Sequence, residues 1–150
     1  MKSPYFSVKE LVCKHVYERY GEGAAMFLDD KLIETLNVIR EQILCAPMTV
    51  NNWHAGGNFT QRGLRCNICE LVKNKTDAGR LYLSAHMLGK AVDCNADGMT
   101  AQEARRLIIE KQELLPYPIR LEDGVSWLHI DLYDNCLLYT SPSPRDTERS

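Results

Sequence analysis

Apolar positions recur at helical spacing in the first third of the chain. The clearest stripe consists of Leu32, Leu36, Ile39 and Ile43. Asp29 or Asp30, just before this stripe, can cap the N-terminus of its helix. Ser7 and Glu10 have the spacing of a capping box and predict an earlier helix, which Gly21 should end. The N-terminal part of the protein is therefore predicted to be helical.

The middle of the chain combines short strands with a long loop. Residues 48–53 and 90–94 are apolar enough to form short strands. Residues 54–65, between them, are rich in glycine and polar side chains, and a loop of this length in a compact domain is a candidate for binding. Thr100 and Glu103 form a second capping box, which predicts another helix after the second strand.

A β-hairpin is predicted at the end of this pattern. Residues 119–122 and 127–133 alternate between apolar and polar positions, and Asp123 and Gly124 form a favourable turn between them. Helices come first and strands later, without regular alternation, which indicates an α+β fold with a small antiparallel sheet. We expect one domain over residues 1–135, with the N-terminal helices packed on the sheet and the functional site on the sheet.

Residues 136–150 have a different character. Two Ser-Pro steps and a polar end cannot continue a packed strand. The segment is expected to be either a natural disordered tail or a non-native one, since its sequence resembles translated sequencing-adapter read-through. No functional residue is assigned to it.

The overall composition argues against two classes of protein. Of the 150 residues, 45% are hydrophobic and 25% are charged, which is typical of one ordinary globular domain. A net charge of −2 offers no basic surface to a phosphate backbone, so no nucleic-acid partner is expected. No apolar run approaches the roughly 18 residues that span a bilayer, so no membrane contact is expected. The N-terminus lacks the apolar core of a signal peptide, so we expect synthesis in the cytoplasm. We also expect the protein to be a monomer.

Three residues in the second half of the chain could form a metal site. His86 precedes a turn at Gly89, and Asp93 lies on the strand after that turn. His129 lies on the second hairpin strand, where Asp131 shares its face. Two imidazoles and one carboxylate are the three protein ligands of a catalytic zinc site, which leaves the fourth position for water. Each residue taken alone also has an ordinary structural interpretation: His86 as a loop histidine, Asp93 as a turn residue and His129 as a core histidine.

The order of these residues resembles a known family. The pattern Ser84-x-His86-x-x-Gly89-x-Ala91-x-Asp93, followed by Trp127-x-His129, is similar to that of the LAS zinc peptidases. This family includes VanY-type D-alanyl-D-alanine carboxypeptidases, phage endolysin peptidases and the hedgehog signalling domain. The resemblance covers residues 47–134 and implies that His86, Asp93 and His129 bind zinc.

The resemblance also implies an activity. Related enzymes hydrolyse peptidoglycan stem peptides near D-amino-acid bonds, either as D-Ala-D-Ala carboxypeptidases or as endolysin-type endopeptidases, so the cell wall is the expected site of action. A water on zinc, activated by a glutamate, would attack the peptide bond. The alternative is a zinc-binding module of hedgehog-like fold that has no catalytic activity.

The position of the catalytic base departs from the carboxypeptidase pattern. Many family members have a glutamate three residues before the last histidine, where this chain has Ser126. Hedgehog-like members instead have it at the end of the preceding hairpin strand, which corresponds to Glu122. Asp123 is the competing carboxylate, although it is also suited to be the first residue of the turn.

Several other residues are candidates for binding substrate. Family members carry a substrate-binding arginine before the metal motif, and both Arg62 and Arg65 lie in the loop there. The planar guanidinium can hold a carboxylate or an oxyanion through two parallel hydrogen bonds. Ser84 and Trp127 are further candidates, whereas His54 is expected to be an ordinary loop residue.

The cysteines suggest a second site. Without an export signal they are expected to be thiols or metal ligands, and a structural zinc could be held by Cys13, His15, Cys66 and Cys69. Chelation by both Cys13 and His15 requires the first helix to stop near Cys13. A redox dithiol and unconnected thiols are the alternatives. Cys45 and Cys94 are predicted to be core residues.

Overall fold

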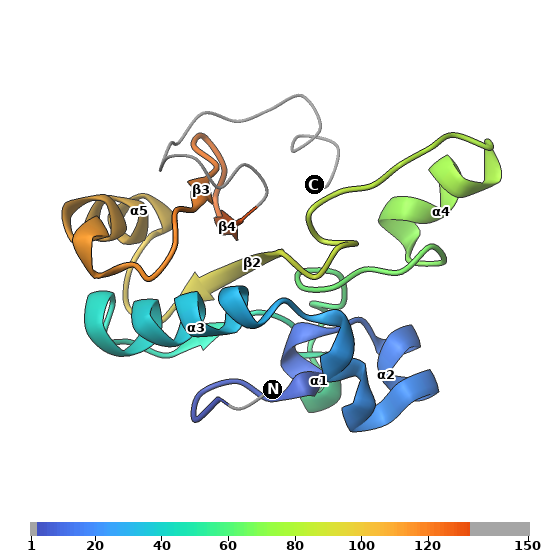
Figure 1. The fold of residues 1–150 in the computed structure, drawn as a ribbon, viewed down its shortest axis with the longest axis horizontal. Helices are drawn as coiled ribbons and strands as arrows, with labels where there is room; N and C mark the ends of the chain where they lie inside the picture. Colours follow the sequence, from blue (N-terminus) through green and yellow to red (C-terminus); the bar gives the residue numbers. More distant parts are fainter. Residues whose placement is uncertain (1–2, 133–150) are drawn as a thin grey trace.

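The computed structural model describes residues 3–132 and has an α+β fold. Its four strands form one antiparallel sheet in the order β1-β2-β4-β3 (Figure 1). The strands are β1 (Met48–Thr49), β2 (Ala91–Ala96), β3 (Arg120–Leu121) and β4 (Leu128–Asp131). The predicted fold class is therefore confirmed.

Residues 3–132 also contain five α-helices and several shorter helical segments. The α-helices are α1 (Val8–Leu11), α2 (Lys14–Tyr20), α3 (Asp30–Val38), α4 (Glu70–Asp77) and α5 (Ala101–Glu110). The shorter segments are the 3-10 helices η1 (Gly21–Phe27), η3 (Trp53–Ala55) and η4 (Gln112–Leu114), and the π-helix η2 (Ile39–Ile43) that continues α3. Helices α4 and α5 lie at opposite ends of the molecule (Figure 1). No helix in residues 3–132 is both long and apolar enough to cross a membrane.

Local signals correctly predicted two of the helices. Asp29 is the N-cap of α3 and accepts a hydrogen bond from the Lys31 amide, and the apolar stripe of α3 and η2 is buried. The capping box of Thr100 and Glu103 begins α5, which packs on β2 and β4. Burial of one apolar stripe is the main source of helix stability in such a small domain.

The first predicted helix is divided into two. The capping box at Ser7 is present and Gly21 ends the second part, but α1 stops at Leu11 and α2 begins at Lys14. Between them the backbone is extended, and Val12 forms a parallel bridge with Leu64. This pairing with a distant segment outweighs local helix propensity and leaves Cys13 at the N-cap of α2.

The two predicted strand regions differ in outcome. The strand expected over residues 48–53 is only two residues long, because the chain then leaves the sheet and the Asn51 side chain donates to the Val12 carbonyl oxygen. The hairpin is confirmed, with Leu121 opposite Ile130. Tyr133, the end of the expected domain at residue 135 and the tail at residues 136–150 lie outside the described residues.

Candidate metal centre

Three buried side chains meet on the sheet. His86 lies in the turn before β2, Asp93 lies on β2, and His129 lies on β4 directly opposite Asp93 in the register. Their potential ligand atoms all lie within 4.8 Å of one another. The structure therefore brings together the three residues expected to be ligands, as a group that could hold a metal ion.

The environment of His86 leaves one of its ring nitrogens available. The carbonyl oxygen of Gly63 lies 2.9 Å from Nδ1, and since a carbonyl only accepts, Nδ1 carries the proton. Nε2 is buried without a hydrogen-bond partner among the described residues and lies 3.3 Å from Asp93 Oδ2. A histidine oriented through one nitrogen, with the other directed at a carboxylate, is arranged as metal ligands usually are.

The turn that carries His86 depends on a glycine, as expected. Gly89 has a φ of 70°, in the left-handed region that favours glycine. A side chain at this position would also collide with the carbonyl oxygen of Phe27. The turn can therefore approach the N-terminal helices closely while it directs His86 toward the sheet.

His129 is held by carboxylates on both sides. Its Nδ1 lies 2.7 Å from Asp93 Oδ1, and its Nε2 lies 2.5 Å from Asp131 Oδ2. Arg120, on β3, donates to both carboxylate oxygens of Asp131. Asp131 was expected to orient either His129 or an arginine, and it contacts both. If Nε2 donates to Asp131, Nδ1 is the nitrogen that could bind a metal next to Asp93.

The electrostatics favour the protonation states that bind metals. Burial lowers the pKa of His86 to about 4, so its imidazole is neutral at neutral pH. Burial alone would raise the pKa of Asp93, but the interactions with His86 and His129 hold it well below its usual range. The pKa of Asp131 is also lowered, because hydrogen bonds from His129 and Arg120 outweigh burial. A neutral imidazole and ionised carboxylates are the forms that act as ligands.

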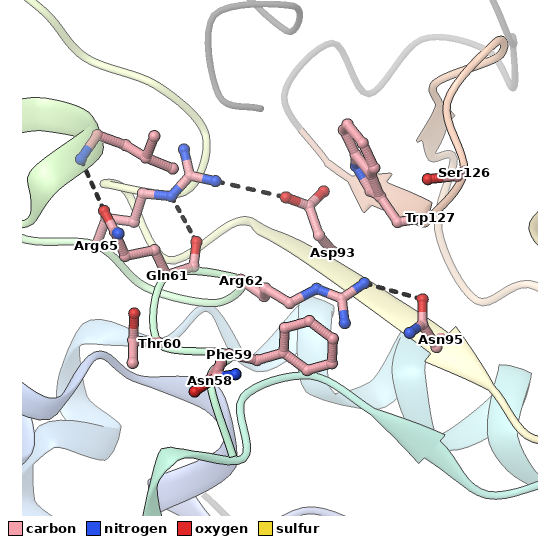
Figure 2. A pocket seen from close by; sticks show the side chains of 11 residues that line it. Asn58, Phe59, Thr60, Gln61, Arg62, Arg65, Asp93, Asn95, Ser126 and Trp127 are labelled. Carbon is pink, nitrogen blue, oxygen red and sulfur yellow. Dashed lines mark hydrogen bonds and ion pairs between the residues drawn. The ribbon is translucent and has the colours of Figure 1, made fainter.

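An open cavity of about 410 Å³ adjoins this group (Figure 2). It is lined by the loop at residues 58–65, by Asp93 and Asn95 on β2, and by Ser126 and Trp127. The carboxylate of Asp93 lies between Arg65 and Trp127, whereas His86 and His129 are buried and do not line the cavity. Asp93 is therefore the member of the group that faces the cavity.

The two candidate arginines have different surroundings. Arg65 is nearly fully buried, donates from Nε to the carbonyl oxygen of Gln61 and lies 3.4 Å from Asp93 Oδ2 through Nη2. Arg62 stacks on Phe59 and donates from Nη2 to Asn95, while its Nη1 has no hydrogen-bond partner among residues 3–132. Arg65 thus contacts a candidate metal ligand, whereas Arg62 contacts Phe59 and Asn95 in the cavity wall.

The two candidate carboxylates also differ. Glu122 is buried and directly follows Leu121, which lies opposite Ile130, the neighbour of His129 on β4. Asp123 is exposed, accepts a hydrogen bond from the Gly124 amide and lies 3.7 Å from Arg105. Its contacts are those of a turn residue.

The remaining candidate site residues lie in different places. Trp127 lines the cavity, and its carbonyl oxygen accepts a hydrogen bond from Arg105. Ser84 begins the turn before β2, where its hydroxyl accepts from the Met87 amide, and it is not among the cavity-lining residues. His54 is exposed and packs edge-on against Trp53, as expected of an ordinary loop residue.

A second group combines sulfur and nitrogen donors. It consists of Cys13, His15, Cys66 and Cys69, and its potential ligand atoms also lie within 4.8 Å of one another. The helix break at Cys13 meets the condition that chelation by both Cys13 and His15 imposes. A hydrogen bond from Cys69 lowers the pKa of Cys13 to about 5, so one thiolate is present at neutral pH.

The other cysteines have separate environments. Cys94 is fully buried, as predicted, and burial raises the pKa of its thiol to about 12. The prediction for Cys45 is wrong: it lies exposed after η2, with a positive φ of 52°.

Two contributors to the metal group were missed in the sequence. Arg120 could have been found, because the hairpin register places it opposite Asp131. The Gly63 carbonyl could not, since a backbone acceptor 23 residues from His86 leaves no local signal.

Comparisons of the chain with protein-family models, with curated proteins and with solved structures found no match.

Proposed function

We propose that this chain is a zinc-dependent peptidase that hydrolyses peptidoglycan stem peptides near D-amino-acid bonds. The observation that supports this most is the convergence of His86, Asp93 and His129 beside an open cavity that contains an arginine. The substrate class comes from the resemblance of the motif around these residues to that of the LAS zinc peptidases. Two imidazoles and one carboxylate are a ligand set of catalytic zinc, and the resemblance to the LAS zinc peptidases favours zinc over iron, which uses the same ligand types.

The residues present fit a zinc ion. Two ligands about 2.05 Å from a tetrahedral ion are about 3.3 Å apart. His86 Nε2 and Asp93 Oδ2 are separated by 3.3 Å, and Nε2 is a buried nitrogen without a hydrogen-bond partner in the described chain. The distance of 2.7 Å between His129 and Asp93 is a hydrogen bond that coordination would replace. Gly63 and Asp131 already hold the other nitrogens of the two rings.

The proposed mechanism assigns a step to each side chain. A zinc ion bound at this group would supply a Lewis acid for the scissile carbonyl and a water of pKa near ~7. Glu122 accepts the proton of the attacking water and returns it to the leaving amine. Arg62, which lines the cavity, holds the carboxylate or the developing oxyanion of the substrate. Trp127 forms part of the cavity wall that positions the peptide.

Replacement of Arg62 is expected to affect catalysis, whereas replacement of Arg65 is expected to affect metal binding. Arg62→Ala should lower kcat/KM by about 10- to 100-fold, the effect of losing one hydrogen bond to a charged group, and should leave the metal content unchanged. Arg65→Lys should instead weaken metal binding, because Arg65 contacts Asp93. Steady-state kinetics and metal analysis of both variants test this assignment. Normal kinetics for Arg62→Ala would contradict it.

Asp131 is expected to set the metal affinity through His129. Asp131→Asn removes the charge that faces His129 Nε2 and Arg120, and loss of such a partner lowers metal affinity by about 10- to 100-fold. Competition with a chelator measures the change. Asp97→Asn, at an exposed position, is the matched control. Equal affinity of the two variants would show that Asp131 does not support a metal ligand.

The substrate class is tested with a pair of peptides. We expect the zinc-loaded protein to cleave a peptide that ends in D-Ala-D-Ala, or intact sacculi, but not the matched peptide that ends in L-Ala-L-Ala. Release of free D-alanine indicates a carboxypeptidase, and release of larger fragments from sacculi indicates an endopeptidase. Cleavage of the L-peptide alone, or of neither substrate, would overturn the proposed substrate.

One observation favours a second candidate function. Ser126 occupies the place where many carboxypeptidases of the resembling family have their catalytic glutamate, and it lines the cavity. If Glu122 does not act as the base, the protein would be a zinc-binding module without turnover. Metal bound at His86 together with no cleavage of either substrate would support this candidate.

A further inference from the structure

We propose that Cys13, His15, Cys66 and Cys69 bind a second, structural zinc ion that fastens residues 60–69 to the start of α2. This role goes beyond the proposed peptidase activity and does not depend on it. The ion would hold in place the loop whose Gly63 carbonyl orients His86. Three thiolates and one imidazole form a closed structural set with no position left for a substrate.

The separations within the cluster match a tetrahedral ion. With zinc–sulfur and zinc–nitrogen bonds of usual length, two sulfurs are about 3.8 Å apart, and a sulfur and a nitrogen about 3.6 Å apart. The Sγ atoms of Cys66 and Cys69 are 3.7 Å apart. Nδ1 of His15 lies 3.5 Å from Cys66 Sγ and 3.7 Å from Cys69 Sγ. Three of the donor atoms are thus already spaced as ligands around one ion, and the Cys13 sulfur lies within 4.8 Å of each of them.

The backbone places the donors by breaking regular structure. Cys13 is extended at the N-cap of α2, so it and His15 reach the same point although a continuous helix would separate them. Cys69 is likewise extended at the N-cap of α4, after a turn in which its amide donates to the Cys66 carbonyl. Two helix starts from distant parts of the chain therefore meet at the four donors.

Helix α4 has little apolar packing to hold it. It buries only Val72, and Ile68, just before it, is exposed. In the cluster itself, Cys13 and Cys69 are buried with the hydrophobic core, whereas Cys66 is partly buried and His15 is exposed. Helix α4 lies at the end of the molecule away from α5 (Figure 1). A metal ion would supply the stability that burial does not, because binding energy at a structural site contributes to folding.

The cluster is connected to the metal centre through the backbone. The Cys13 amide donates to the Leu64 carbonyl, and the Leu64 amide donates to the Leu11 carbonyl. The neighbouring Gly63 carbonyl accepts from His86, and the Arg65 amide donates to the His86 carbonyl. Release of the second ion should therefore loosen the support of His86 without removing a ligand from it.

A redox dithiol is the main alternative for Cys66 and Cys69. Their Sγ atoms are close enough to each other for a disulfide after a small movement. A dithiol, however, needs only two sulfurs and does not account for the convergence of Cys13 and His15 on the same point. Zinc coordination uses all four donors.

Cobalt substitution and metal analysis of the full chain test the proposal. Zinc content should fall by about one ion per chain in Cys66→Ser and in Cys13→Ser, and should not change in Cys45→Ser, whose exposed thiol lies outside the cluster. With Co²⁺ in place of zinc, we expect a strong thiolate-to-metal charge-transfer band. The band should persist in His86→Ala and disappear in Cys66→Ser.

Two outcomes would overturn the second site. One is a cobalt-loaded parent protein that lacks the thiolate band, a result that needs no variant to fold. The other is a Cys66–Cys69 disulfide in the protein purified under reducing-agent-free conditions, with no zinc at the cluster. Neither outcome depends on hydrolysis, so failure of this proposal and failure of the proposed peptidase activity can be told apart.

Discussion

Replacement of His86 by alanine is expected to remove the metal ion from the His86, Asp93 and His129 group and to lower hydrolysis by at least about 10³-fold. The metal is proposed to stabilise the charge of the transition state by several kcal/mol, and each 1.36 kcal/mol of this stabilisation changes the rate by a factor of about ten. His86 supplies the ligand nitrogen that has no hydrogen-bond partner in the described chain. Its replacement leaves only two of the three ligands. Metal content and turnover of the purified variant measure the effect.

Two controls make the result specific. His54→Ala alters an exposed loop histidine and should change neither metal content nor turnover. Since His86 is buried, the variant must also be shown to be folded, and its circular dichroism spectrum and cooperative thermal unfolding provide that evidence. Unchanged metal content in a folded His86→Ala variant would refute the assignment of His86 as a ligand.

The second large effect is expected at Glu122. Glu122→Gln keeps the shape and the hydrogen-bonding capacity of the side chain but removes the proton acceptor. Turnover should fall by roughly 10²- to 10⁴-fold, the usual contribution of general acid–base catalysis. The metal should remain bound, because Glu122 is not among the residues that form the metal group. Single-turnover kinetics with a peptide that the parent cleaves would measure the chemical step.

Asp123→Asn is the matched control for Glu122→Gln. Asp123 is the adjacent carboxylate, but it is exposed and its side chain accepts from the Gly124 amide. Asparagine also suits this turn, so the variant should have nearly normal activity. A larger loss in Asp123→Asn than in Glu122→Gln would identify Asp123 as the base.

Features with local causes could be predicted from the sequence. The capping boxes at Ser7 and Thr100 and the hairpin turn at Asp123 depend on residues close in the chain, and each is present in the structure. The break at Val12 could not be predicted, because it depends on pairing with Leu64, far along the sequence. Long-range pairing is the usual reason that local propensity fails.

The metal group was predictable to a similar extent. The three residues His86, Asp93 and His129 carry their signal in their types and spacing, and the sheet register brings two of them opposite each other. The sequence left Arg62 and Arg65 as equal candidates. Their difference comes from side-chain burial and from one contact to Asp93, which depend on how the loop folds back on β2.

The most direct test of the account is the dependence of turnover on zinc. Metal-free protein should not cleave the D-Ala-D-Ala peptide, and added zinc should restore cleavage in the parent and in Cys45→Ser but not in His86→Ala. Magnesium should not replace zinc, because it favours oxygen ligands and octahedral geometry. Cleavage by metal-free protein, or a filled His86 group without cleavage, would contradict the proposal of a zinc peptidase.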